Sequence, residues 1–113
     1  MSSTTPGFTV EIDDPADDRV SIRVKGELDM AATPTLTQAI VGTGHVPHIC
    51  LDLSGVTFLD SSAIGALVAS GREVGERGSR LEIGPRSDIV TRVLEITGLG
   101  ESSEAFDVLP GDG

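Results

Sequence analysis

Three consecutive polar residues, Asp60, Ser61 and Ser62, form the segment of this sequence best suited to chemistry. They follow an apolar stretch typical of a strand and precede the longest helical pattern of the chain, and open α/β sheets place their sites at such junctions. The first amides of a helix lack intrahelical partners and lie at the positive end of its dipole, so a phosphate on a serine there is stabilised. Alternatively, Asp60 or Ser61 only caps the helix, and this interpretation stays open.

The helix predicted to start at Ser61 has an unusual solvent face. At 100° per residue its core side receives mostly apolar residues: Ile64, Leu67, Val68, Gly71 and Val74. Its opposite side receives mostly very small ones: Ser62, Gly65, Ala66, Ala69 and Glu73. An ordinary solvated face would be rich in long charged side chains. The small residues therefore permit either close approach of another protein beside the serines or close packing within the domain itself.

Enzymatic and metal chemistry find little support in the residues. Ser61 lacks the Gly-x-Ser-x-Gly elbow of hydrolases. His45 and His48 precede the central strand, so we expect them at the opposite end of the sheet from Ser61. No cysteine or acidic cluster joins the histidines as metal ligands, and no phosphate-binding glycine loop is present. We therefore predict no catalytic residue, no metal and no cofactor.

Composition excludes several classes of partner. The 113 residues carry 18 acidic against 8 basic side chains, a net charge of −10, with three Phe and no Trp or Tyr. Nucleic-acid binding requires cations and often stacking aromatics, and an anionic membrane also requires cations, so neither is expected. A partner with a basic surface is favoured instead. The start of the chain does not resemble a signal peptide, and a cytoplasmic location is predicted.

The remaining pattern predicts the elements that position Asp60 and Ser61. Strands are expected at 8–12, 20–24, 48–53, 80–83 and 106–109, and helices from Thr33, over 61–77 and over 85–96. The mostly apolar 48–53 segment favours a central strand covered on both faces, and Ile89, Val93 and Ile96 are expected to face inward. The fold class is therefore α/β, a small mixed β-sheet of four to five strands with three to four helices packed on it. The expected organisation is a flexible lead-in at 1–7, one domain at 8–109 and a tail at 110–113.

Three stretches together resemble a known family. They are Gly-Glu-Leu-Asp ending at Asp29, the run Leu-Asp-Leu-Ser-Gly-Val-Thr-Phe-Leu-Asp-Ser-Ser-x-x-Gly-x-Leu at 51–67, and the stretch from Val90 to Phe106. In this order, over residues 8–109, the chain is similar to the STAS domain of anti-sigma factor antagonists. The Asp-Ser-Ser motif in its position is the specific part of the likeness.

The resemblance implies a partner switch. In the family, an anti-sigma factor that is itself an ATP-dependent serine kinase phosphorylates the serine corresponding to Ser61. The unphosphorylated domain binds the anti-sigma factor and frees the sigma factor, so the family regulates transcription, and a serine phosphatase resets the phosphoprotein. The residues expected at the partner-binding face are Asp60, Ser62, Gly65, Ala66 and Ala69, with Asp29 and Glu27 added by the likeness. Ala63 departs from the glycine of many members.

An alternative function for the same fold stays open. The chain could be a non-catalytic STAS scaffold or a regulatory subunit of a larger signalling or transporter assembly. In that reading Ser61 belongs only to the helix start. Phosphorylation of Ser61 separates the two interpretations.

Overall fold

Six strands and three helices make up the part of the chain that the computed structural model describes, residues 2–5 and 7–110. The strands are β1 (Ser2–Thr5), β2 (Phe8–Ile12), β3 (Arg19–Leu28), β4 (His48–Leu59), β5 (Arg80–Arg86) and β6 (Asp107–Val108). The helices are α1 (Thr33–Val41), α2 (Ser61–Glu76) and α3 (Asp88–Ile96). The predicted α/β class is confirmed. Within the described ranges, no helix combines the length and the apolar character needed to cross a membrane.

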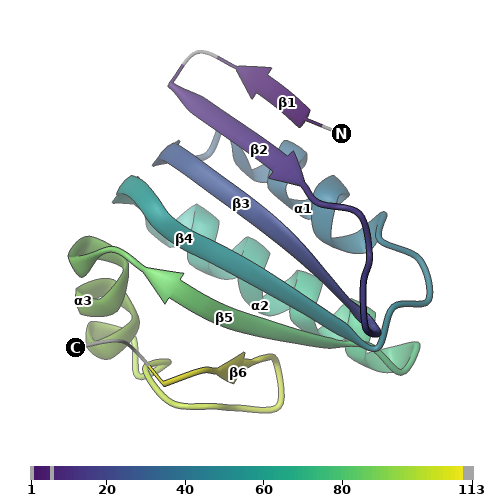
Figure 1. Cartoon of the computed structure of the whole chain (residues 1–113). Coiled ribbons are helices and arrows are strands. Elements are labelled where there is room, and N and C mark those ends of the chain that lie inside the picture. Colours follow the sequence, from purple (N-terminus) through teal and green to yellow (C-terminus); the bar gives the residue numbers. More distant parts are fainter. Residues whose placement is uncertain (1, 6, 111–113) are drawn as a thin grey trace.

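The strands lie in the sheet in the same order as in the sequence (Figure 1). β1, β2 and β3 pair antiparallel, whereas β3, β4, β5 and β6 pair parallel. Parallel strands require crossovers, which are right-handed in nearly all proteins. Because β3, β4 and β5 advance in one direction across the sheet, their crossover helices α1 and α2 fall on the same face, and Figure 1 shows both behind the sheet.

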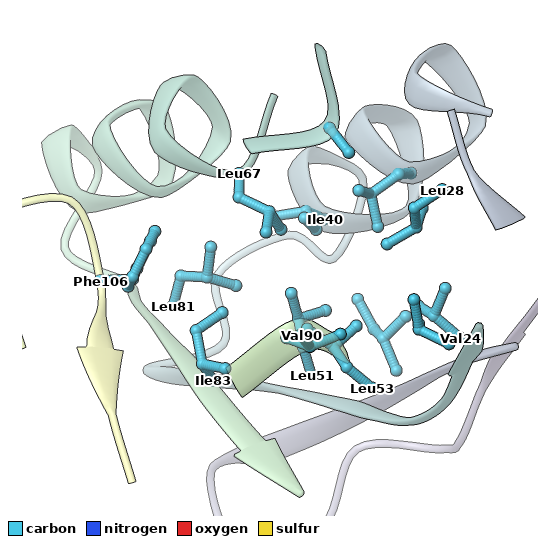
Figure 2. Close-up of a cluster of buried hydrophobic side chains, with 14 of the residues drawn as sticks. Val24, Leu28, Ile40, Leu51, Leu53, Leu67, Leu81, Ile83, Val90 and Phe106 are labelled. Carbon is cyan, nitrogen blue, oxygen red and sulfur yellow. The ribbon is translucent and has the colours of Figure 1, made fainter. Parts of the chain in front are cut away.

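The core lies between this helix pair and the sheet. Figure 2 shows Ile40 of α1 and Leu67 of α2 above strand residues such as Leu51 and Ile83, all of them fully buried. Aliphatic residues dominate this core, and Phe8 and Phe106 are its aromatic members. The core therefore holds α2, and with it the residues at the start of α2, in a fixed position on the sheet.

The prediction that the 48–53 segment is covered on both faces is wrong. Ile49, Leu51 and Leu53 are buried, but the alternate residues, including Cys50 and Asp52, are only half-buried or exposed. Both crossover helices lie on one face, so the other face of this segment carries polar groups. There the buried carboxylate of Glu82 pairs with Arg19 and with His48.

The third helix differs from its prediction in start and in orientation. It begins at Asp88, because Pro85 belongs to β5. Its buried residues are Val90 and Leu94, one turn apart, whereas Ile96 is 77% exposed. Ile96 follows Leu94 by two positions, about 200° around the helix, and so faces away from the core.

The two ends of the chain add detail that the sequence pattern did not predict. Within the predicted lead-in, β1 pairs with β2 as an edge strand of the sheet. At the other end β6 covers only Asp107–Val108, shorter than the expected 106–109. The predicted tail at 110–113 lies outside the described residues apart from Pro110.

Candidate partner-binding site

The carboxyl ends of β3 and β4 lie side by side and position the acidic residues of the site. Leu28 pairs with Leu59, and the amide of Asp60 donates a hydrogen bond of 3.2 Å to the carbonyl oxygen of Leu28. The chain leaves the sheet at Asp29 and at Asp60, so these two residues emerge from the same edge. Glu27 precedes them on β3 and is exposed. The structure thus brings together the acidic residues expected at the site.

Asp60 is the N-cap of α2. Its Oδ1 accepts a hydrogen bond of 3.0 Å from the amide of Ala63, and its carbonyl oxygen accepts one from Ile64. The capping interpretation therefore holds for Asp60, whereas Ser61 is the first residue of the helix. The amides of Ser61 and Ser62 remain among the orphan donors at the positive end of the helix dipole.

The Ser61 side chain is open to solvent. It is exposed, and none of the described residues makes a hydrogen bond to its hydroxyl. Ser62 is half-buried. Of the two neighbouring hydroxyls, that of Ser61 is the more accessible to a second protein.

The strip of small residues on α2 is not filled by the domain's own core. Gly65 and Ala69 are exposed, and Ser62 and Ala66 are half-buried. A Cβ atom added at Gly65 would meet no atom of residues 2–5 and 7–110 within 4 Å beyond its own helix backbone and chain neighbours. Between the two interpretations of this face, close packing within the domain is therefore excluded at Gly65, and the strip offers a smooth surface running from Ser61 along the helix.

The carboxylates around Ser61 carry uncompensated charge. In the described part of the chain no ion pair involves Glu27, Asp29 or Asp60, although other acids pair with arginines. Asp29 has a local role as well, because its Oδ1 accepts a hydrogen bond of 3.2 Å from the amide of Ala32. The electrostatic surroundings of Ser61 are therefore acidic and suit a cationic partner surface.

Sequence reasoning missed two large apolar side chains at the same edge. Met30, directly after Asp29, is 70% exposed, and Phe58, two residues before Asp60, is 47% exposed. Phe58 lies beyond the strand predicted at 48–53, so no orientation is predicted for it. The pairing of β3 with β4 shifts register between Gly26 and Glu27, opposite this end of β4, and such an irregularity cannot be recognised from hydropathy.

The two histidines lie at the end of β4 opposite to Ser61. His48 begins β4, whereas Ser61 follows its end, so the two lie at opposite ends of the strand (Figure 1). The Nδ1 atom of His48 lies 2.8 Å from Oε2 of Glu82, and His45 lies in the loop before β4.

Within the part of the chain that the structure describes, the thiol of Cys50 and the metal-ligating side chains offer no second reactive site. Burial, followed by the nearby charge of Glu82, raises the pKa of the Cys50 thiol, which disfavours its thiolate. No group of three or more metal-ligating side chains occurs among the described residues.

Comparison with known proteins places this arrangement in a family. A family model described as "Mlab, STAS domain" matches residues 13–110. The anti-sigma-B factor antagonist of Listeria monocytogenes is 33% identical over 105 residues, which cover 89% of this chain and 90% of that protein.

Solved structures agree with the sequence comparison. An anti-sigma factor antagonist from Mycobacterium paratuberculosis superposes with a TM-score of 0.75 at 30% identity, covering 96% of this chain and 90% of that one. The anti-sigma factor antagonist SpoIIAA in its unphosphorylated form gives a TM-score of 0.70 at 25% identity, covering 89% of this chain and 88% of that one. Matched over most of its length both in sequence and in fold, the chain belongs to the STAS-domain family of anti-sigma factor antagonists.

Proposed function

We propose that this protein binds an anti-sigma factor kinase while Ser61 is unphosphorylated and is released when that kinase phosphorylates Ser61. The anti-sigma factor, once bound here, no longer holds its sigma factor. A serine phosphatase would remove the phosphate and restore binding. In this role the chain is a regulatory partner and a phosphoprotein, and the transfer chemistry belongs to the kinase.

One observation carries the proposal: Ser61 is exposed at the start of α2, beside an exposed strip of very small side chains, and no described residue makes a hydrogen bond to its hydroxyl. A kinase must reach the acceptor oxygen, and a docking partner must approach the backbone of α2 closely. Both conditions are met at the same end of one helix. The relative SpoIIAA supports the comparison, because it is an antagonist for which an unphosphorylated form is distinguished.

The charges near Ser61 explain how one phosphate could release a partner. Phosphorylation adds about −1.5 to −2 charges next to Asp60, where neither Glu27 nor Asp29 has an ion-pair partner among the described residues. A partner packed on Gly65 and Ala69 would have to desolvate the dianion. A cost of about 4 kcal/mol lowers affinity by roughly a thousandfold. The phosphate itself sits at a helix N-terminus, so α2 need not unfold.

The test is phosphorylation by the anti-sigma factors of the source organism. Each purified anti-sigma factor is incubated with ATP and with the wild-type chain, the Ser61→Ala variant or the Ser62→Ala variant, and the products are analysed by intact mass and peptide mass spectrometry. We expect one phosphate on the wild type and on Ser62→Ala, and none on Ser61→Ala. Phosphate retained on Ser61→Ala and lost from Ser62→Ala would move the acceptor to Ser62.

The outcome also separates the switch from the scaffold. Tight binding to a partner with no phosphate transferred by any anti-sigma factor would replace the switch by a non-catalytic STAS scaffold or regulatory subunit. That alternative shares the fold and the family model. The scaffold differs from the switch because its function does not require phosphorylation of the Ser61 hydroxyl.

A further inference from the structure

Three large apolar side chains are strongly exposed in the described part of the chain: Met30, Phe58 and Ile96. Single exposed apolar residues are common on protein surfaces. Here, however, two of the three lie at the edge that carries Ser61. Met30 follows Asp29, and Phe58 is paired with Glu27 across β3 and β4.

The backbone at both residues lies close to Ser61, at the same edge of the sheet. Phe58 precedes Ser61 by three residues, so their Cα atoms are at most about 11 Å apart. Met30 and Ser61 each lie two residues beyond the paired residues Leu28 and Leu59, on neighbouring strands. Adjacent strands are about 4.8 Å apart, so the two chain segments leave the sheet together.

From this juxtaposition we propose that Met30 and Phe58 are the apolar anchors by which the anti-sigma factor is held on the Ser61 surface. The inference rests on the proposed function and names the residues that supply its affinity. Apolar side chains that become buried at the centre of an interface contribute most of the binding energy, while the charged rim contributes mainly orientation and association rate. The small residues of α2 add close contact but little apolar area.

Charge complementarity indicates the chemistry of the occupant. The anchors stand among Glu27, Asp29 and Asp60, and none of these carboxylates has an ion-pair partner among the described residues. The matching surface is therefore an apolar pocket rimmed by Arg or Lys side chains. A second copy of this chain fits poorly, because an isologous contact would oppose the same carboxylates, in a chain of net charge −10.

The test compares a double variant with a matched control. Met30→Gln and Phe58→Thr together remove the apolar surface and keep, respectively, side-chain length and strand preference. Ile96→Gln removes a comparably exposed apolar side chain from α3. The probe is the unphosphorylated anti-sigma factor that wild type binds, without ATP, and the dissociation constant is measured by calorimetry.

We expect the double variant to bind at least tenfold more weakly, with Ile96→Gln within twofold of wild type. The urea midpoint of each variant checks that the fold is retained, and each single variant replaces the double one if the double variant fails to fold. Equal affinity of wild type and double variant for the anti-sigma factor would overturn the proposal that Met30 and Phe58 are anchors. An equal loss of affinity in Ile96→Gln would also overturn it. Self-association of wild type that disappears in the double variant would overturn them too, by assigning the surface to a second copy. Failure of wild type to bind any anti-sigma factor would instead count against the proposed function.

Discussion

Ser61 is available because its neighbour performs the structural task at that helix start. The Oδ1 of Asp60 accepts a hydrogen bond of 3.0 Å from the amide of Ala63, so the Ser61 hydroxyl is not required for capping. A serine that capped the helix itself would hold its oxygen against the backbone. The division of labour between Asp60 and Ser61 thus leaves one oxygen of the motif free for modification.

Replacing Asp60 separates its cap from its charge. Asp60→Ala should lower the free energy of unfolding by about 0.5–2 kcal/mol, because the Ala63 amide loses its acceptor. Asp60→Asn retains an acceptor oxygen and should stay closer to wild type. Urea unfolding followed by circular dichroism measures both. Equal losses in the two variants would show that the carboxylate charge, and not the cap, stabilises α2.

At the residue scale, the sequence predicted the start of α2 better than the surroundings of that start. Asp60 and Ser61 were recognisable because a polar triplet separates an apolar strand from a helical pattern. Met30 and Phe58 were not, because their exposure depends on a register shift between β3 and β4 and on the path of the chain after β3. Hydropathy reports what a side chain is, and not whether a neighbouring element covers it.

At the scale of elements, α2 shows two glycines with opposite tasks. Gly71 is buried, and a Cβ atom there would lie 2.1 Å from the carbonyl oxygen of Ala105. Gly65 lies on the exposed face, where a Cβ atom would contact no other described part of the chain within 4 Å. The first glycine permits packing inside the domain, and the second leaves room for a partner outside it.

Alanine substitutions should therefore act in opposite directions. Gly65→Ala should raise the free energy of unfolding by about 0.4–1 kcal/mol, because alanine is the better helix former and no atom is displaced. Gly71→Ala should lower it by more than 1 kcal/mol, because the backbone near Ala105 must move. Thermal and urea unfolding of the two variants measure the difference. A destabilising Gly65→Ala would mean that this face is packed against the domain.

The positions of the helices and strands were largely predictable from the sequence. Which of their faces are buried was less predictable. β2 and α2 follow alternation and helical periodicity closely, because local pattern determines them. The predictions for the covering of the 48–53 segment and for the orientation of Ile96 were wrong. The first depends on which face of the sheet α1 and α2 occupy, and the second on how α3 packs against β4. That arrangement follows from strand order, which the local pattern does not contain.

At the scale of the whole molecule, an ion pair reinforces the backbone pairing of the last strand, β6, with β5. The Arg80 guanidinium of β5 lies 2.8 Å from Oδ1 of Asp107 in β6 and also donates to the carbonyl oxygen of Glu104. The hydrogen bond from Arg80 to Asp107 lowers the pKa of the Asp107 carboxyl below its ordinary value. The carboxylate form therefore favours the folded state above the unfolded pKa of about 3.9, and this contribution is lost as pH falls through the folded pKa.

Stability should report this linkage in acid. Asp107→Asn keeps an acceptor for Arg80 but removes the charge, so it should reduce the free energy of unfolding at pH 6. The difference from wild type should begin to shrink below about pH 4, where the carboxyl of the unfolded chain takes up its proton, and should disappear only as pH falls through the lower pKa of the folded carboxyl. Urea unfolding at a series of pH values checks this. A difference that stays constant from pH 6 to pH 3 would contradict the ion pair as its cause.

Release of the partner requires that one phosphate change the affinity of an otherwise unaltered surface. The most direct measurement is calorimetric titration of the anti-sigma factor with the chain before and after stoichiometric phosphorylation of Ser61, alongside circular dichroism of both forms. We predict that the phosphorylated chain binds roughly a thousandfold more weakly while its helical content is unchanged. Equal affinity of the two forms would contradict the account, as would a loss of affinity that accompanies unfolding of α2.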